Sequence, residues 1–504
     1  MIATKLALSI LLLTSGIIQP QIASAVVDFD VDVDAGVDVD EAIPSNLRGL
    51  ATSDAKTYIV SFTDRDVSPA KRCAAIAKAN GGTVGFIYTD VLNGCSITLP
   101  VSQFQVQSTI TALNNRPEVK LVNEDKMMYV AKPKMEDSLF TSQAVSVTAK
   151  SWGLDRVDQC SLPLNNLATK QSATGVRVFI LDTGVRSTHQ EFTGMIGDAN
   201  GCHYSAITPN TPTAALSDGH GHGTHVAGTA CGHNYGVASN CVICPVQILS
   251  SSGSGSNSGV ISGINFVVGK CKGAAFRCVI NMSIGGGLDT SLNTAVNNAV
   301  ANGVVVVVAA GNDAKDACSY SPSSAADAIT VGSTTNTDAK SSFSNIGNCV
   351  DVYAPGSDII SASISSNTGT TTMSGTSMAS PHVAGMAAAI LSQNPSLTPK
   401  QVRDAIVNKA KLVASTSPWY IATDCSSASV TTSSPTTQPT LKPTTKSPTS
   451  IPTANPTTQS PTSLPTSSST TVSPTVSPTG EPTFLPTTSS PTDCTCVCPS
   501  STTS

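Results

Sequence analysis

Residues 375–385 read Gly-Thr-Ser-Met-Ala-Ser-Pro-His-Val-Ala-Gly and open an apolar, alanine-rich run that extends to Leu391. Such a run predicts a buried helix, with Ser377 at or near its first turn. A hydroxyl in that position lies near unpaired backbone N–H groups, which would stabilise an oxyanion. Pro381 fits a first turn better than a helix interior, because proline has no N–H to donate. Ser377 could equally be a simple N-cap, so the upstream sequence has to decide its role.

The composition and the first residues indicate an exported protein. The chain has 504 residues, of which 12% are charged, and its net charge of −5 favours neither nucleic acid nor an acidic substrate as a partner. Lys5 precedes an apolar run over 6–18, and Ala-Ser-Ala at 23–25 supplies small residues for cleavage of a secretory signal peptide. No later run is long enough for a membrane span, and 15 cysteines suit an oxidising compartment. We therefore expect a secreted, extracellular protein.

Shifts in composition divide the chain into six segments. Alternating Val and Asp after the signal peptide predict a solvated spacer, because one face of a strand there would consist of carboxylates. Ser/Thr/Pro repeats at the other end cannot build a core and predict an extended, O-glycosylated stalk, compatible with attachment to a cell surface or wall. The expected segments are a signal peptide (1–25), an acidic disordered spacer (26–56), a small α+β domain (57–130), a linker (131–150), the largest domain (151–425) and a Ser/Thr/Pro-rich stalk with terminal cysteines (426–504).

In the largest domain, short apolar runs alternate with helical patterns. The expected strands are Val176–Leu181, Val242–Leu249, Val279–Met282, Val304–Ala310 and Ile329–Val331. The expected helices lie near Thr224–Ala230, Gly259–Val268, Leu292–Asn302, Ser377–Ser392 and Pro399–Lys409. This alternation predicts an α/β fold, a mostly parallel twisted sheet with helices on both faces. Functional sites in such sheets form at the carboxyl ends of the strands.

Two further stretches bear on the role of Ser377. The strand at 176–181 ends in Asp182, and a carboxylate at the exit of a buried strand is held rigidly, which suits the orientation of a base. Residues 218–229 read Asp-Gly-His-Gly-His-Gly-Thr-His-Val-Ala-Gly-Thr, in which the glycines allow close approach of the backbone before a helix begins. The sequence contains no Gly-x-Ser-x-Gly elbow, which disfavours an α/β-hydrolase.

Three motifs, in this order along the chain, resemble the signatures of subtilisin-like serine proteases. They are Asp-Thr-Gly-Val at 182–185, His-Gly-Thr-His-Val-Ala-Gly-Thr at 222–229 and Gly-Thr-Ser-Met-Ala-Ser-Pro-His-Val-Ala-Gly at 375–385. The similarity is greatest to the proteinase K and aqualysin branch, whose mature N-terminus resembles Ser-Trp-Gly-Leu-Asp-Arg at 151–156. The resemblance covers about residues 152–411, and the small domain before it resembles the inhibitory propeptide of the family.

The resemblance implies a role for each motif residue. Ser377 would be the nucleophile, His222 the general base and then acid, and Asp182 the group that fixes the histidine tautomer. The run Val-Val-Val-Val-Val-Ala-Ala-Gly at 304–311 resembles the strand before the oxyanion asparagine of the family, which assigns that role to Asn312. Asn312 could otherwise be an ordinary turn residue after a strand.

Two glycine-rich stretches resemble the substrate-binding edges of the family. Bare glycine backbone can pair with an extended peptide by strand addition. The family resemblance implies a polypeptide substrate, with broad preference and an apolar residue before the cut. The implied substrate-binding residues are Gly253, Ser254 and Gly255 on one edge and Ser283, Ile284, Gly285 and Gly286 on the other.

The resemblance also implies a structural calcium ion. Asp351 matches a ligand of the family, with backbone oxygens expected from Ala326 and Ala328, although the family has Pro and Val at those two positions. Oxygen ligands suit Ca²⁺, and the alternative is an ordinary surface aspartate. The histidines near residue 222 could suggest zinc, but the glycines between them interrupt a helical ligand spacing.

Cysteine matches are partial. Cys318 and Cys349 match a disulfide of the aqualysin-like branch, whereas Ser217 and Ser251 stand where its second disulfide would lie. Six further cysteines depart from the family, and their connectivity cannot be deduced from the sequence. They are Cys202, Cys231, Cys241, Cys244, Cys271 and Cys278.

The sequence is therefore interpreted as a secreted, calcium-stabilised, monomeric serine endopeptidase made as a preproenzyme. Its own propeptide would act as an intramolecular inhibitor, and self-cleavage is expected within the linker, between about residues 140 and 151. Two other interpretations are an inactive homologue that acts as a binding module and a surface adhesin whose stalk is the functional part. Intact motif residues argue against the first, and the absence of a recognition pattern in the stalk argues against the second.

Overall fold

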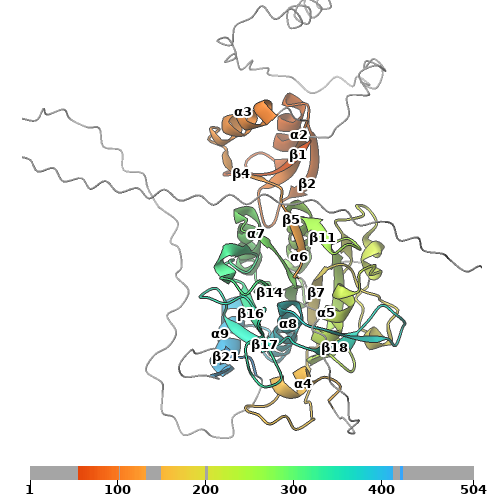
Figure 1. The fold of residues 1–504 in the computed structure, drawn as a ribbon. Coiled ribbons are helices and arrows are strands. Elements are labelled where there is room, and N and C mark those ends of the chain that lie inside the picture. Colours follow the sequence, from red (N-terminus) through yellow and green to blue (C-terminus); the bar gives the residue numbers. More distant parts are fainter. Residues whose placement is uncertain (1–54, 101–102, 132–148, 199–201, 413–419, 424–504) are drawn as a thin grey trace, which may run out of the picture. The chain divides into compact units, whose positions relative to one another are not determined.

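The computed structural model describes residues 55–100, 103–131, 149–198, 202–412 and 420–423, and its main element is a nine-stranded sheet (Figure 1). In spatial order the strands are β20 (Lys411–Leu412), β21 (Tyr420–Ile421), β17 (Val352–Pro355), β16 (Ile329–Thr334), β14 (Val305–Ala309), β12 (Arg277–Met282), β7 (Val176–Asp182), β10 (Val242–Gln247) and β8 (Tyr204–Ser205). Every neighbouring pair is parallel except β20 and β21. All five expected strands are present, and four strands of this sheet were not predicted, namely β8, β17, β20 and β21. The predicted signal peptide and stalk lie outside the described residues.

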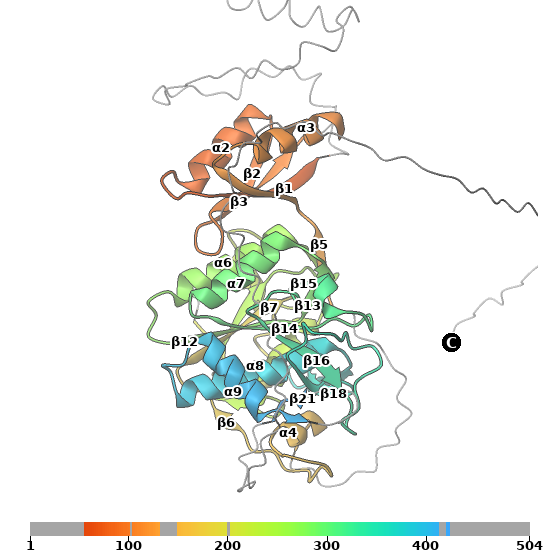
Figure 2. The ribbon, with the colours of Figure 1, turned by 90° about the vertical axis from the view of Figure 1, so that its left-hand side faces the viewer.

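Helices cover both faces of this sheet, as the predicted α/β fold requires. They are α5 (His222–Cys231), α6 (Asn257–Cys271), α7 (Thr290–Ala301), α8 (Thr376–Gln393) and α9 (Pro399–Lys409). Val178 and Ile180 of β7 share one core with α5, α8 and α9, whereas Phe179 and Leu181 share the other with α6 and α7. This alternation follows from the two-residue period of a strand. Figure 2 shows α6 and α7 on one side of the sheet and α8 and α9 on the other.

The start of α8 places Ser377 in the first turn, as predicted from the sequence, but Pro381 differs from its predicted position. The N-cap of α8 is Gly375, so Ser377 is the second residue of the helix and not a cap. Pro381 lies inside the helix, one turn beyond the position expected for it. Because proline has no N–H, the carbonyl of Ser377 lacks the usual partner four residues later. The Ser283 hydroxyl donates to that carbonyl instead, at 2.8 Å, which ties the first turn of α8 to the sheet.

Residues 56–124 form a smaller α+β unit with its own antiparallel sheet. Its strands, in spatial order, are β2 (Thr83–Tyr88), β3 (Gly94–Leu99), β1 (Lys56–Phe62) and β4 (Val119–Glu124), and its helices are α2 (Pro69–Ala79) and α3 (Gln103–Asn114). A disulfide joins Cys73 of α2 to Cys95 of β3 within the core of this unit.

The remaining elements are short and surround the large sheet. They are α4 (Trp152–Val157), β5 (Met127–Val130), β6 (Gln171–Ser172), β9 (Ala238–Ser239), β11 (Ser254–Ser256), β13 (Ile284–Gly287), β15 (Tyr320–Ser321), β18 (Ile359–Ala362), β19 (Thr370–Met373) and three 3₁₀ helices, η2 (Gln190–Phe192), η3 (Pro212–Leu216) and η4 (Ala317–Ser319). No helix within the described ranges is long and apolar enough to cross a membrane.

The cysteine pairs that the sequence left open are local. The structure joins Cys318 to Cys349, the pair implied by the family resemblance. The three further disulfides of the peptidase region that can be placed are Cys202–Cys244, Cys231–Cys241 and Cys271–Cys278. Two of them close loops of only 10 and 7 residues in sequence separation, at the ends of α5 and α6. Such short loops remove little entropy from the unfolded chain, so these disulfides act mainly on local structure.

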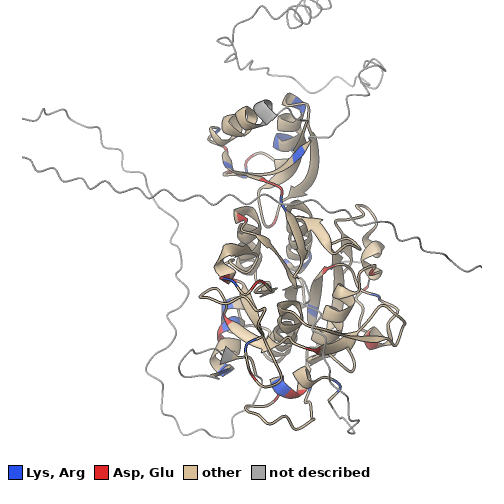
Figure 3. Ribbon diagram, viewed as in Figure 1, with Lys and Arg blue, Asp and Glu red and all other residues tan. Residues whose placement is uncertain are grey.

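Charged residues are sparse in the strands of the large sheet (Figure 3). The charged residues of the six longer strands are Arg177, Asp182 and Arg277, and these strands are β7, β10, β12, β14, β16 and β17. Of the three charged residues, Asp182 alone is fully buried. Burial of a carboxylate is costly unless donors surround it. The carboxyl end of β7 is therefore the first place in the sheet to look for a functional site.

Gly385 marks a close approach of α8 to α5. A Cβ added there would lie 2.8 Å from the Ala230 carbonyl oxygen and 2.8 Å from the Val237 Cβ. We expect Gly385→Ala to lower the melting temperature by several degrees, because overpacking costs ~1–3 kcal/mol. Gly269→Ala is the matched control in the exposed face of α6, where the nearest atom lies 3.5 Å away and the change should be neutral or stabilising. Equal melting temperatures for the two variants in a Ser377→Ala background would contradict this packing.

Candidate active site

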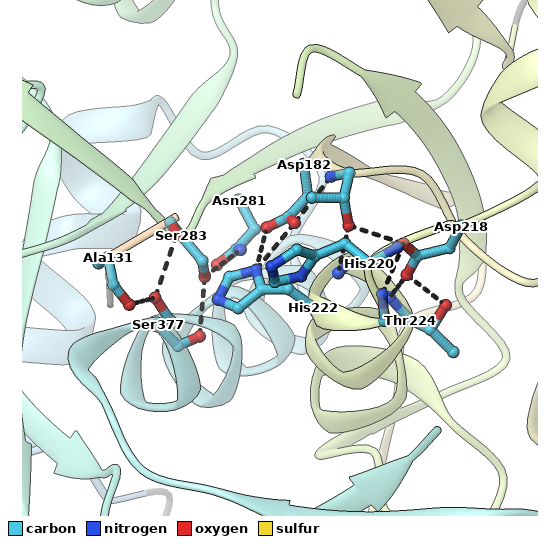
Figure 4. Close-up of polar contacts among 12 residues, drawn as sticks. Ala131, Asp182, Asp218, His220, His222, Thr224, Asn281, Ser283 and Ser377 are labelled. Atoms are coloured by element: carbon cyan, nitrogen blue, oxygen red, sulfur yellow. Dashed lines mark hydrogen bonds and ion pairs between the residues drawn. The ribbon is translucent and has the colours of Figure 1, made fainter. Parts of the chain in front are cut away.

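Asp182 and His222 meet at the carboxyl end of the large sheet. Asp182 is the last residue of β7 and His222 the first residue of α5, and both are fully buried. The His222 Nδ1 lies 2.8 and 2.9 Å from the two carboxylate oxygens of Asp182 (Figure 4). The backbone N–H groups of Ile248 and Leu249 both donate to the Asp182 carbonyl, which ends β10 and fixes the end of β7. A carboxylate at Nδ1 keeps the proton on that nitrogen and leaves Nε2 as the acceptor.

Ser377 lies on the far side of the His222 ring from Asp182 (Figure 4). Its Oγ is 3.2 Å from the backbone oxygen of Ala131 and 3.1 Å from that of Ser283, so its single proton is directed to carbonyl groups. The His222 Nε2 is buried and has no hydrogen-bond partner among the residues that the structure describes. The structure thus joins Asp182 to His222 directly, and it holds the Ser377 hydroxyl against the Ala131 carbonyl.

A buried polar network behind Ser377 was not anticipated from the sequence. The Asn281 Nδ2 donates to the Ser283 hydroxyl at 2.9 Å, and the Ser380 hydroxyl donates to the Asn281 Oδ1 at 2.7 Å. Asn281, Ser283 and Ser380 are fully buried. Because buried polar groups need partners, an asparagine in an apolar strand was the available signal for such a network. The network fixes the Ser283 hydroxyl, which in turn holds the carbonyl of Ser377.

Asn312 follows β14, and its side chain is oriented by the start of α8. Its Oδ1 accepts hydrogen bonds from the backbone N–H and the hydroxyl of Thr376, both at 2.8 Å. With the amide oxygen held in this way, the Nδ2 lies near Gly375. A Cβ built at Gly375 would lie 3.1 Å from the Asn312 Nδ2 and 3.8 Å from the Ala131 oxygen. The amide donor and the carbonyl oxygen thus flank the same point beside Ser377.

Strand β5 occupies the space between the two glycine-rich edges. It forms the sheet β11-β5-β13-β15 and runs antiparallel to both β11 and β13. The Val130 N–H donates to the Gly253 carbonyl at 2.9 Å, and the Ala131 N–H donates to the Ser283 carbonyl at 3.4 Å. All seven residues expected to bind an extended peptide lie in or next to these two strands, namely Gly253, Ser254, Gly255, Ser283, Ile284, Gly285 and Gly286.

Two other histidines lie near the site and are held neutral. The His225 Nε2 is 2.9 Å from the Ile359 carbonyl, and the His382 Nδ1 is 2.8 Å from the Met378 carbonyl. Both rings are fully buried inside their helices. Burial lowers the pKa of His225 to about 3 and the pKa of His382 to about 4.

The surroundings of Asp351 do not fit the calcium site expected there. Its carboxylate forms an ion pair with the Arg403 guanidinium through one oxygen, and the other oxygen accepts the Thr330 N–H at 2.8 Å. A guanidinium in direct contact already supplies the positive charge and would repel a divalent cation. Ala326 and Ala328, whose backbone oxygens were the other expected ligands, lie just before β16. Within the described residues there is also no group of three or more His, Cys, Asp or Glu side chains that could hold a metal ion.

Comparisons with known proteins agree with this geometry. The family described as Peptidase_S8, the Subtilase family, matches residues 173–449. The chain is 45% identical over 328 residues to an extracellular serine proteinase of Thermus sp. (strain Rt41A), covering 65% of this chain and 73% of that protein. It is 42% identical over 303 residues to subtilisin-like protease 4 of Trichophyton rubrum, covering 60% of this chain and 70% of that protein.

A solved structure gives the same result for the fold. The crystal structure of a cold adapted subtilisin-like serine proteinase superposes with a TM-score of 0.51 at 44% sequence identity, covering 56% of this chain and 100% of that one. The chain therefore belongs to the subtilase family of serine proteinases. The fold class and the family expected from the sequence are both confirmed.

The two neutral histidines predict a loss of stability in acid. An unfolded histidine titrates near pH 6.5, so below that pH the unfolded chain binds protons that the native state excludes. The free energy of unfolding should fall between about pH 6.5 and 4, by up to about 1.4 kcal/mol per pH unit for each histidine. His382→Gln should make this decline shallower, as measured by urea unfolding of a Ser377→Ala protein. An unchanged slope would contradict the assignment.

Because Arg403 supplies the positive charge beside Asp351, we expect that calcium binding at Asp351 does not contribute to the stability of the protein. Arg403→Gln would leave a nearly buried carboxylate without its cation, which typically costs about 3 kcal/mol or more. We expect its melting temperature to fall equally in calcium and in chelator. The control is Lys400→Gln, which removes an exposed ion pair on the same helix and should change little. The interpretation fails if Arg403→Gln is neutral and Asp351→Asn alone abolishes a chelator effect.

Proposed function

We propose that this subtilase is an extracellular serine endopeptidase that cuts polypeptides through an acyl-enzyme on Ser377. The observation that carries the proposal is the Ala131 carbonyl, which lies against the Ser377 hydroxyl while Asp182 binds the far side of the His222 ring. An extracellular location is supported by the signal-peptide pattern and by the relatives named above, which include an extracellular proteinase. Membership of the family supports a polypeptide substrate.

In the proposed reaction, the His222 Nε2 takes the proton of Ser377 as the Oγ attacks the carbonyl carbon of the substrate. This requires a small rotation of the Ser377 hydroxyl away from the carbonyl groups that it now contacts. Asp182 keeps the Nδ1 proton in place and stabilises the imidazolium that forms. His222 then gives the proton to the leaving amine, and water hydrolyses the acyl-enzyme by the same steps in reverse.

The negative charge that develops on the carbonyl oxygen needs donors. The Asn312 Nδ2 and the backbone N–H of Ser377, in the first turn of α8, are the groups that we assign to this role. The Thr376 contacts fix the Asn312 amide before any substrate arrives, so little reorganisation is needed during the reaction. Loss of one such donor typically lowers kcat by ~10²–10³.

The proposed specificity follows from the way in which β5 lies in the cleft. Its backbone pairs with bare backbone on both edges, which accepts many side chains. Ala131 before the reacting carbonyl is 7% exposed, and Met128 three residues earlier is fully buried. Tyr129, between them, points outward and is 48% exposed. The enzyme should therefore prefer small or apolar residues at the first and fourth positions before the cut and tolerate any residue at the third.

The same geometry supports self-cleavage of the precursor. The carbonyl against Ser377 belongs to the Ala131–Lys132 bond, at the start of the predicted linker. This favours a first cut after Ala131, upstream of the interval of 140–151 that the sequence suggested. Residues 132–148 lie outside the described part of the chain. We therefore place the proposed maturation site at Ala131.

Residues 57–131 are positioned to remain in the cleft as an inhibitor after that cut. The Asp125 carboxylate accepts the Ser258 N–H at 2.8 Å near the start of α6. The Asn265 Oδ1 accepts the N–H groups of three successive residues, Thr89, Asp90 and Val91, at 2.8–3.3 Å. These contacts do not involve the bond that would be cut. Cleavage alone would therefore not release the propeptide, which supports inhibition until it is degraded.

Self-processing gives the sharpest test of the proposed function. The Ser377→Ala precursor, refolded with no other protease present, should stay intact because the nucleophile is missing. Wild-type precursor should be cut into two pieces, and intact mass under denaturing conditions should show an N-terminal fragment whose C-terminal residue is Ala131. Ser392→Ala is the control, since Ser392 lies on the same helix and its hydroxyl bonds to the Thr174 carbonyl. Formation of the fragment by purified Ser377→Ala would show that Ser377 is not the nucleophile.

A further inference from the structure

Asp218 lies four residues before His222 and is 7% exposed, and it is neither a nucleophile nor a base. Its Oδ1 accepts three hydrogen bonds (Figure 4). They come from the Thr183 hydroxyl at 2.9 Å, the His220 N–H at 3.0 Å and the Gly221 N–H at 2.8 Å. One carboxylate oxygen thus holds the residue after Asp182 and the backbone that leads into His222.

The second oxygen of Asp218 caps the helix that carries His222. Its Oδ2 accepts the backbone N–H of Thr224 at 2.9 Å and the hydroxyl of Thr224 at 2.7 Å. The N-cap of α5 is Gly221, with φ of 97°, and it has no side chain to cap the helix. The first turn of α5 therefore obtains its cap from Asp218, which lies outside the helix.

Thr183 connects this carboxylate to the other half of the Asp182–His222 pair. Its hydroxyl donates to Asp218 and accepts the Gly223 N–H at 3.0 Å, and its own N–H donates to the Asp182 Oδ1 at 2.8 Å. Asp182 lies on β7 and His222 on α5, 40 residues apart in sequence. Asp218 and Thr183 are therefore a direct polar link between the two segments, separate from the Asp182–His222 bond itself.

We propose that Asp218 is a positioning residue for peptide hydrolysis, which sets the relative placement of Asp182 and His222 through Thr183 and the first turn of α5. This inference rests on the proposed function of those two residues. Only a carboxylate suits the position, because all five groups around it are donors and an asparagine amide would direct N–H groups at some of them. A misplacement of about 1 Å at a reacting group can lower the rate ~10²-fold.

The test compares Asp218→Asn with a control at the opposite end of α5. Glu191→Gln removes a buried carboxylate that accepts the N–H groups of Asn234 and Tyr235, just beyond the helix. Both variants should lose stability. Asp218→Asn alone should lower kcat about tenfold or more with KM within twofold, because the cleft strands are untouched. Its downfield His222 Nδ1–H signal in NMR should shift or broaden, whereas the signal of Glu191→Gln should match wild type.

Thr183 keeps the proposal testable if Asp218→Asn does not fold. Thr183→Val removes the linking hydroxyl at nearly constant volume and should lower kcat, and Thr183→Ser should restore it. Titration with a fluorophosphonate counts the active sites in each sample, and labelling of wild-type Ser377 shows that the proposed function itself holds. If wild type labels and turns over, while Thr183→Val and any folded Asp218→Asn stay within twofold of wild-type kcat, the positioning role is wrong.

Discussion

The rest of the site depends on a buried carboxylate that forms no ion pair with a Lys or Arg of the described part of the chain. Asp182 is fully buried at the end of β7, and the group that faces it is the imidazole of His222. Such burial is costly unless the carboxylate is surrounded by donors, and here the donors are the His222 ring and the Thr183 N–H. These donors offset the cost of burial. The parallel sheet brings the ends of β7 and β14 and the start of α8 to the same edge. The fold thereby places a potential base, an amide donor and a serine within one small volume.

The strand β5 completes this arrangement by supplying a peptide in the cleft. It pairs with β11 and β13 through the backbone and ends at Ala131, directly against Ser377. The pairing supports both the proposed broad substrate range and the proposed inhibition by the chain's own N-terminal region, since a tethered peptide is present at an effective concentration of about millimolar for short linkers. In this proposal, specificity comes from the few side chains that the cleft buries, of which Met128 is the largest.

The sequence predicted the parts of the site that lie in continuous motifs. Asp182, His222 and Ser377 stand in long stretches with a fixed order, and the helical and strand patterns around them were correct except for cap positions. Contacts between distant segments were not readable. Arg403 meets Asp351 across 52 residues, and nothing in either local pattern announces that ion pair. Asp218 stands in the stretch 218–229, but its proposed role depends on Thr183, which only the folded sheet brings to it. The family resemblance implied the Cys318–Cys349 disulfide correctly. The pairing of the six further cysteines could not be predicted, because connectivity is a property of the fold.

The central claim is that Ser377 is a nucleophile activated by His222, whose orientation depends on Asp182. Labelling of the processed protein by a fluorophosphonate, followed by peptide mapping, tests it most directly. The account predicts one label per molecule, on Ser377, with labelling slowed by orders of magnitude in Asp182→Asn, as expected when the histidine tautomer is lost. A label on another residue, or an undiminished labelling rate in folded Asp182→Asn, would contradict it.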